Sequence, residues 1–250
     1  MDKVQVLNIG IAATTQESLC RDLKEGVLVT PNLDHLVMLQ NDYDFYCAYR
    51  KAEWVVCDST ILFWCSKLLK RPIPRVIQGS TFFELFYKYH ATQNDCSIFL
   101  LGAKEGVAEK AMNNINSSVN KNIVVGCYSP YFGFENDENE NLKIVQIINE
   151  SKANVVVVGL GAPKQEKWIM KYKDLMPNVK TWMALGATID FEANFVRRAP
   201  VFIQKCGLEW LFRFIQEPKR LFRRYFINDP KFFYYFFKQL IGKYKNPFND

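Results

Sequence analysis

The chain has 250 residues, of which 49% are hydrophobic, so it can bury one substantial core; this excludes a disordered chain and favours one domain with an appendage. The formal net charge is only +6, but residues 197–245 hold twelve Lys or Arg against three acidic residues, so this segment alone carries +9. No window reaches the roughly 18 uncharged apolar residues of a spanning helix, so we expect no membrane-spanning segment.

Strand-like and helix-like segments alternate along the chain. The expected strands are residues 4–12, 27–30, 54–57, 97–101, 123–127, 155–158 and 181–185. The expected helices are residues 15–24, 33–49, 61–69, 81–90, 105–119, one that ends at Ser151 and one that begins at Lys164, with a polar loop over 128–141. This alternation predicts an α/β fold, in which a Rossmann-like, mostly parallel sheet has helices on both faces.

The start of the chain and its cysteines bear on location. Residues 1–3 lead directly into a strand-like segment, so we expect no secretory signal. The seven cysteines are odd in number, lack CxxC spacing and lie mostly in apolar runs, which favours free thiols in a reducing compartment. We therefore expect a cytoplasmic protein.

The basic segment is also rich in aromatic residues, including six in a row at 232–237. We expect residues 1–196 to form the α/β core and residues 197–250 a helical, basic and aromatic appendage. Three interpretations remain open: an anionic membrane surface, which the mixture favours, packing of the aromatic residues on the core, and nucleic acid. Exposed aromatic residues are also compatible with a homo-oligomer.

Ligands of such sheets bind beyond the carboxyl ends of the strands, so the residues that follow each strand are candidates. The valine strand ends in a glycine turn at residues 159–163, where a helix begins. Thr30 and Asn32 follow the second strand, and Asp58 follows the third. Asn32 or Asp34 can equally be a helix cap, and Asp58 can be a cap or a general base for a hydroxyl group.

The usual signatures of nucleotide and metal sites are absent from the sequence. There is no GxxxxGK[ST] motif, and the glycine turn lacks the third glycine of GxGxxG. The two histidines are not spaced for zinc, and no DxD pair follows a strand, because Asp42 and Asp44 fall within an expected helix as part of a solvated face. We expect no metal and no cofactor.

The whole chain resembles the WecG/TagA/CpsF glycosyltransferases. The segments that carry the resemblance are Thr30-Pro31-Asn32 with His35, Asp58, Arg75 before Gly79-Ser80, residues 100–102, Asp190-Phe191 through Ala199-Pro200, and Arg223-Arg224-Tyr225. The two longest motifs are GxGxPxQExW at residues 159–168 and GLEWxxRxxxEPxR at residues 207–220.

The resemblance implies an inverting, metal-independent hexosyltransferase. It would move N-acetylmannosamine or a related hexose or uronic acid from a UDP-sugar to a polyprenyl-diphosphate-linked sugar, for teichoic acid, capsule or exopolysaccharide. It would lie peripherally on the inner face of the plasma membrane, with the appendage closing over the site, and would not act on nucleic acid. A nucleotide- or lipid-binding regulator without catalysis is the alternative.

The resemblance also implies roles for residues. Asp58 resembles the catalytic base, and Thr30 resembles a second catalytic residue, which with Asn32 positions the sugars. The substrate-binding positions are Asn32, Arg75, Gly102, Gly161, Gln165 and Asp190, with Arg213, Arg220 and Arg223 expected to neutralise the donor diphosphate. The spacing of the three arginines predicts one helical face, although Arg213 can instead pair with Glu209, and Gln165 can be an ordinary surface residue.

Two positions depart from the family pattern. Ser59 and Asn194 stand where the family commonly has glycine. If those positions need a positive φ, Asn194 tolerates it well and Ser59 does not.

Overall fold

The computed structural model describes residues 2–200, 202–203 and 207–248. It begins with β1 (Lys3–Val6) and β2 (Ile9–Ala12), an antiparallel hairpin that stands apart from the main sheet. The prediction of one strand over residues 4–12 is therefore wrong, because Leu7 turns the chain with a φ of 51°.

The main sheet has six strands, all parallel, in the order β4-β3-β8-β7-β5-β6. The strands are β3 (Gly26–Val29), β4 (Trp54–Val55), β5 (Ile98–Gly102), β6 (Val124–Tyr128), β7 (Val155–Gly159) and β8 (Thr181–Ala184). The central strands are continuous apolar runs because helices cover both of their faces.

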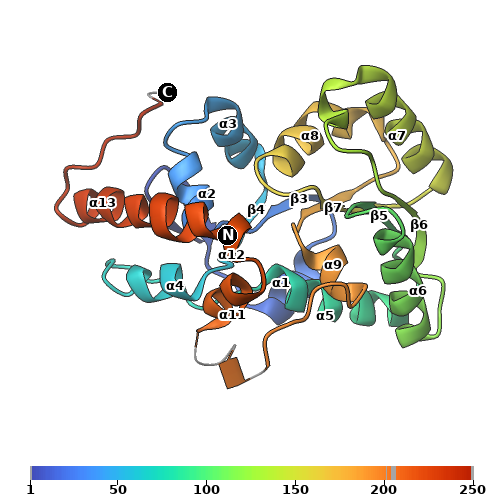
Figure 1. Ribbon diagram of the computed structural model, residues 1–250, viewed down its shortest axis with the longest axis horizontal. Coiled ribbons are helices and arrows are strands. Elements are labelled where there is room, and N and C mark those ends of the chain that lie inside the picture. Colours follow the sequence, from blue (N-terminus) through green and yellow to red (C-terminus); the bar gives the residue numbers. More distant parts are fainter. Residues whose placement is uncertain (1, 201, 204–206, 249–250) are drawn as a thin grey trace.

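The two helical layers follow from the alternation of side chains along each strand. In β7, Val156 and Val158 face one core, while Val155 and Val157 face the other. The first core is covered by α2 (Leu33–Met38), α3 (Tyr43–Lys51), α7 (Glu138–Ser151) and α8 (Lys164–Tyr172), and the second by α1 (Gln16–Asp22), α5 (Gly79–Gln93), α6 (Val107–Val119) and α9 (Thr188–Glu192). Figure 1 shows α3, α7 and α8 above the sheet and α1, α5 and α6 below it. The predicted fold class is confirmed.

Residues 33–49 form two helices rather than the single helix expected. Asp42 ends the run, because its side chain accepts a hydrogen bond from the backbone N–H of Phe45 at 3.0 Å and caps α3. Asp42 also pairs with Lys167 at 2.7 Å. The interpretation of Asp42 as part of a solvated mid-helix face is therefore wrong.

Smaller differences concern element ends. The third predicted strand shortens to β4, and α4 (Thr60–Ser66) ends three residues before the predicted helix does. The polar loop after β6 contains a short 3-10 helix, η1 (Phe134–Asn136), and another, η2 (Lys173–Leu175), follows α8. None of these differences moves the carboxyl end of the sheet.

The C-terminal region is helical, as predicted. It consists of α11 (Glu209–Gln216), α12 (Pro218–Arg223), the π-helical turn η3 (Arg224–Asn228) and α13 (Asp229–Leu240). The first two helices bury only Leu221. By contrast, α13 buries Phe232 and Phe236 in the core that includes α2, and Gln239 hydrogen-bonds to the β1–β2 hairpin.

The aromatic run at residues 232–237 is therefore divided between two environments. Phe232 and Phe236 pack on the core, whereas Phe233, Tyr234 and Phe237 are exposed. Within the described residues, no helix has the length and apolar character needed to cross a bilayer. Six cysteines of the described chain are free, and Cys206 lies outside it.

Candidate functional site

A cavity of about 580 Å³ lies at the carboxyl end of the sheet, under the C-terminal helices. Its floor comes from the loops that follow β3, β4, β7 and β8, and its roof comes from α11, α12, η3 and the start of α13. The chain leaves β3 toward one face of the sheet and leaves β8, its neighbour, toward the other, which opens a crevice between these loops.

This cavity collects seven of the residues singled out from the sequence: Thr30, Asn32, Asp58, Gly161, Gln165, Arg213 and Arg220. They come from six separate elements or loops. Four others, all within the described chain, do not line it: Arg75, Gly102, Asp190 and Arg223.

Asp58 lies on the cavity floor, three residues after the end of β4. Its backbone N–H donates to the carbonyl of Pro31 at 3.2 Å, which ties the loops after β3 and β4 together. Its side chain does not cap α4, because Ser59 does so, accepting from the N–H of Leu62 at 3.2 Å. Instead, Asp58 accepts a hydrogen bond from the backbone N–H of Gly79, at the start of α5.

The electrostatics of Asp58 suit a base. Burial and then the nearby Glu209 carboxylate raise the pKa of Asp58 to about 7, against the opposing effects of Arg213, the Gly79 amide and Arg224. Near neutral pH, Asp58 is therefore poised between its two protonation states. This is the range in which a carboxylate exchanges protons most effectively.

Thr30 and Asn32 belong to the loop after β3, and this loop lies beside Asp58. Thr30 is buried, and Asn32 is half-buried. The Oδ1 atom of Asn32 accepts from the N–H of His35 at 3.2 Å, so the capping interpretation of Asn32 holds even though this residue also lines the cavity. His35 is neutral, because burial and then Arg224 lower its pKa to about 3.

Gln165 joins two loops of the floor. Its Oε1 atom accepts from the backbone N–H groups of Gly161 and Gly186, each at 3.1 Å, and its Nε2 atom donates to Glu166 at 2.9 Å. The side chain is buried, so the interpretation as an ordinary surface residue is wrong. These bonds hold the glycine turn after β7 against the loop after β8.

Glu166 is fully buried beneath this turn. Its Oε2 atom has no hydrogen-bond partner among the described residues. Burial raises its pKa to about 7, against hydrogen bonds from Gln165 and a backbone N–H. A buried carboxyl with one unpartnered oxygen is most stable when protonated.

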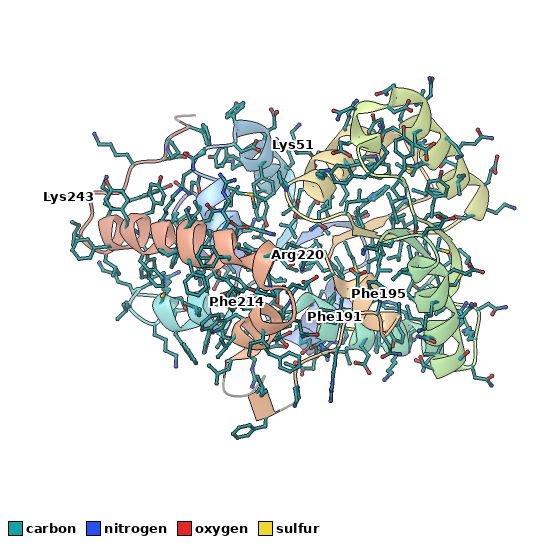
Figure 2. The ribbon with its side chains drawn as sticks, viewed as in Figure 1. Lys51, Phe191, Phe195, Phe214, Arg220 and Lys243 are labelled. Carbon is teal, nitrogen blue, oxygen red and sulfur yellow. The ribbon has the colours of Figure 1, made fainter. Side chains whose placement is uncertain are left out.

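The arginines of the roof differ in their partners. Arg213 lies over the ring of Phe191 at 5.6 Å, and its buried Nε has no hydrogen-bond partner within the described chain. Arg220 pairs with Glu217, and Arg224 with Asp34 at 3.6 Å. Figure 2 shows Arg220 near the centre of the molecule, between the C-terminal helices and the segment that carries Phe191 and Phe195.

The prediction of one helical face for the three arginines is wrong. Pro218 begins a new helix between Arg213 and Arg220, so the residue spacing does not continue. Within α12, Arg220 lines the cavity and Arg223 is exposed outside it, whereas Arg224, the first residue of η3, lines the cavity. Glu209 accepts from Gln78 at 2.6 Å, and no Arg213–Glu209 ion pair occurs in the described chain.

The other predicted positions outside the cavity have local structural settings. Arg75 is exposed, and its charge acts on Glu17. Gly102 has a φ of 124° and packs so closely on β7 that an added Cβ would lie 2.5 Å from the carbonyl oxygen of Gly159. Asp190 is half-buried; burial raises its pKa, opposed most by Arg220.

Sequence reasoning missed several cavity residues with clear chemistry, among them Gln78, Glu209 and Arg224. Gln78 directly precedes α5 and does not follow a strand, so the pattern of strand ends did not indicate it. Glu209 and Arg224 are within the quoted motifs, so the motif itself was the available signal.

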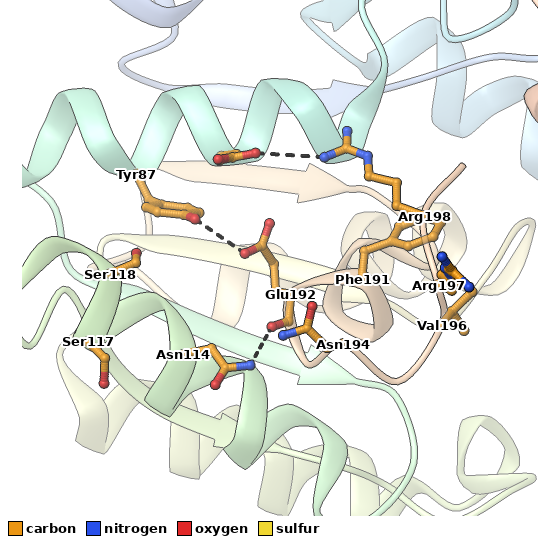
Figure 3. Close-up of a pocket in the computed structure, with 11 residues that line it drawn as sticks. Tyr87, Asn114, Ser117, Ser118, Phe191, Glu192, Asn194, Val196, Arg197 and Arg198 are labelled. Atoms are coloured by element: carbon orange, nitrogen blue, oxygen red, sulfur yellow. Dashed lines mark hydrogen bonds and ion pairs between the residues drawn. The ribbon is translucent and has the colours of Figure 1, made fainter. Parts of the chain in front are cut away.

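A second cavity, of about 850 Å³, lies between α5, α6 and the segment after α9. Figure 3 shows Tyr87 directed at Glu192 and the side chain of Asn114 bonded to the backbone of Glu192. Arg198 is held by Ser80, Thr81 and Glu84. This second cavity lies among the helices on one face of the sheet rather than beyond the carboxyl ends of the strands. The first cavity is therefore the better candidate for a ligand site.

The comparison with known families decides the identity at the family level. The profile of the Glycosyl transferase WecG/TagA/CpsF family matches residues 4–246, nearly the whole chain. The chain belongs to this family. It is therefore a glycosyltransferase of a family that acts in surface polysaccharide synthesis.

The two departures from the WecG/TagA/CpsF pattern have simple structural outcomes. Asn194 takes a φ of 53°, the left-handed conformation that asparagine was expected to tolerate. Ser59 has a φ of −140°, an extended conformation without strain, and its side chain caps α4. No group of three or more potential metal ligands occurs in the described part of this glycosyltransferase.

Proposed function

We propose that this glycosyltransferase is an inverting hexosyltransferase that moves a sugar from a UDP-sugar to a polyprenyl-diphosphate-linked sugar. N-acetylmannosamine and related hexoses or uronic acids are the proposed donor sugars. The observation that carries the proposal is the arrangement of one cavity, in which Asp58 on the floor faces Arg213 on the roof.

The chemistry assigns one role to each side of the cavity. The acceptor hydroxyl gives its proton to Asp58 as its oxygen forms a bond to the anomeric carbon. The bond between that carbon and the diphosphate oxygen breaks on the opposite face, and its electron pair leaves with UDP. Arg213 and Arg220 stabilise the charge that develops on the diphosphate, so a metal ion is not required in this proposal.

The experiment that tests this proposal combines product detection with ligand binding. Purified protein is offered a panel of UDP-sugars and a short-chain lipid-diphosphate N-acetylglucosamine, and mass spectrometry detects the product. Asp58→Asn should lose at least about 100-fold in turnover while still binding UDP. Undiminished turnover would refute Asp58 as the base. If no product forms with any donor although UDP binds, the alternative of a non-catalytic binding protein is supported.

We also propose that the C-terminal helices lie on an anionic membrane at the inner face of the plasma membrane. Their exposed apolar residues are Leu211, Ile215, Phe222, Phe226, Ile227, Phe233, Tyr234, Phe237 and Leu240. These side chains are interspersed with Lys and Arg, the pattern of a surface that meets lipid headgroups. Sedimentation without lipid would show whether the same residues associate in a homo-oligomer.

Point substitutions test the membrane proposal better than truncation. Removal of all residues after Ala199 would also take Phe232 and Phe236 out of the core. Phe222→Ser with Phe226→Ser should instead weaken binding to phosphatidylglycerol vesicles without unfolding the core, because both side chains are exposed. Unchanged vesicle binding would contradict the proposal.

A further inference from the structure

A short segment at the start of α5 holds two carboxylates of the cavity at once. The side chain of Gln78 donates to Oε2 of Glu209 at 2.6 Å, and the backbone N–H of Gly79, the next residue, donates to Asp58. Glu209 belongs to the first turn of α11, whereas Asp58 belongs to the core. The contact with Gln78 therefore determines how close a second negative charge comes to Asp58.

The charged groups that face Asp58 come mainly from the C-terminal helices. Glu209 and Arg213 approach from α11, and Arg224 approaches from η3. On the core side, the Gly79 amide bonds to Asp58, and the Tyr49 hydroxyl lies within its electrostatic influence. Glu209 opposes ionisation of Asp58, and the two arginines favour it.

Resting on the proposed function, we propose that Glu209 is a positioning residue that makes Asp58 a stronger base when α11 is seated on Gln78. The acceptor proton moves to Asp58, and the like-charge repulsion between the two carboxylates is relieved in that step. A bound diphosphate would neutralise the charge of Arg213, so the effect of Glu209 would then be less opposed.

The test separates the charge of Glu209 from its hydrogen bond. Glu209→Gln keeps an oxygen that accepts from Gln78 but removes the charge. We expect the acidic limb of the pH profile of kcat/KM to move to lower pH by roughly half a unit or more, while the plateau of kcat above that limb falls only about two-fold. Gln78→Ala keeps the charge but removes the contact, so it should mainly raise KM.

The control is Glu84→Gln, which removes a carboxylate from the outer part of α5 that pairs with Lys88 and Arg198. Thermal melting of each variant checks folding. A Glu209→Gln profile that superimposes on the wild-type profile would overturn the inference, even if Asp58→Asn is inactive as the proposed function requires. An active Asp58→Asn would instead overturn the proposed function.

An independent observation concerns α4 and the turn that follows it. Between Asp58 and Glu84 the chain has no acidic residue and four cations, three of which, Lys67, Lys70 and Arg71, lie in the turn that follows α4. All three cations are exposed and none forms an ion pair within the described chain. Two large apolar side chains are exposed beside them, Trp64 at 50% and Leu68 at 68%.

This face of α4 continues the surface of the C-terminal helices. The ring of Trp64 lies against Gly207, where an added Cβ would be 2.9 Å from it. Ile61 of α4 and Phe233 of α13 line the same cavity. Figure 1 shows α4 next to α11 and below α13. The cavity is therefore flanked by exposed apolar and basic residues on both sides.

We infer that α4 and its following turn form a second contact with the anionic bilayer. Trp64 and Leu68 would enter the interfacial region, while the three cations meet lipid phosphates. This inference extends the proposed membrane association from the C-terminal helices to the core. The complementary charge is what selects an anionic bilayer as the partner.

The test compares two sets of charge removals in the full chain. Lys67→Gln, Lys70→Gln and Arg71→Gln together should weaken partition onto phosphatidylcholine vesicles that contain phosphatidylglycerol roughly 100-fold. Turnover of a water-soluble short-chain acceptor should not change. The control removes the same charge at the amino ends of β3, β7 and β8 through Lys24→Gln, Lys152→Gln and Lys180→Gln, exposed positions at the opposite end of the sheet.

Leu68→Ser, compared with Leu142→Ser on α7, tests the apolar part in the same way. One outcome would be that the α4 variants bind vesicles like the wild type, whereas Phe222→Ser with Phe226→Ser weakens vesicle binding. In that case the inference about α4 fails and the proposed membrane association of the C-terminal helices survives. If the control variant loses vesicle binding equally, the effect depends on net charge alone and the inference is overturned. The inference would also be overturned if an RNA oligonucleotide displaced the protein from vesicles at physiological salt and the protein showed no preference for anionic lipid.

Discussion

Replacement of Glu166 by glutamine should change how the stability of the protein depends on pH. Glu166 is buried next to Gln165, and its pKa is raised by burial from 4.5 to about 7. The folded carboxyl therefore keeps its proton to a higher pH than the unfolded one does. Because the folded state binds more protons between pH 4.5 and about 7, stability falls as the pH rises through this window.

The size of the effect follows from that interval. At 1.36 kcal/mol for each pH unit, the interval from 4.5 to about 7 corresponds to about 3 kcal/mol. Glu166→Gln removes this dependence but keeps an oxygen for the bond from Gln165. Its new NH₂ group would have no partner, which adds a constant cost of about 1–3 kcal/mol at every pH.

Urea denaturation of both proteins between pH 4.5 and 8 measures the difference. The free energy of unfolding of the variant, relative to the wild type, should rise by about 3 kcal/mol over this range. Glu138→Gln is the control, because hydrogen bonds with Lys171 and Tyr172 lower the pKa of Glu138 below 4.5, so its relative stability should hardly vary over this range. A relative stability of Glu166→Gln that does not vary with pH would refute the reasoning.

Three further outcomes follow from the structure. Gly102→Ala should lose at least about 2 kcal/mol in urea denaturation, because its Cβ would meet a carbonyl oxygen at 2.5 Å, whereas Gly133→Ala, also at positive φ but in open space, should lose only about 1 kcal/mol. Phe232→Ala should lose about 3–5 kcal/mol in the same assay, since this ring of α13 is fully buried against the core. A loss below about 1 kcal/mol would mean that α13 is not docked as described. In steady-state assays, Arg213→Ala should lower kcat/KM at least about 100-fold, because Arg213 lines the cavity, whereas Arg223→Ala should lower it only a few-fold. Equal losses would contradict the boundary of the cavity.

The overall fold was predictable from the sequence because its signal is local. Each strand of the main sheet is a short apolar run bounded by polar or glycine-rich segments, and the runs alternate with helical periodicity. The predicted element boundaries are wrong where one side chain or one backbone conformation interrupts such a run. Leu7 divides an apolar stretch into a hairpin by a positive φ, and Asp42 divides a helix by capping the next one.

The candidate site was predictable only in part. The ends of the strands located Thr30, Asp58 and Gln165, since parallel strands bring their carboxyl ends to one edge. The role of Gln165 was not predictable, because its hydrogen bonds reach two glycines from different loops. Helical spacing also failed to separate Arg223 from Arg224, because it assumed a continuous α-helix where α12 ends at Arg223 and the π-helical turn η3 begins at Arg224.

The sequence by itself determined the fold class, the family and the edge of the sheet at which the candidate site lies, because these depend on periodicity and on motifs that are contiguous along the chain. Only the tertiary structure decided which charges act on one another. Gln78, Glu209 and Asp58 are far apart in sequence, yet they meet through α5 and α11. Burial and charge act through space, so the pKa of Asp58 is a property of that assembled cavity and not of any one segment.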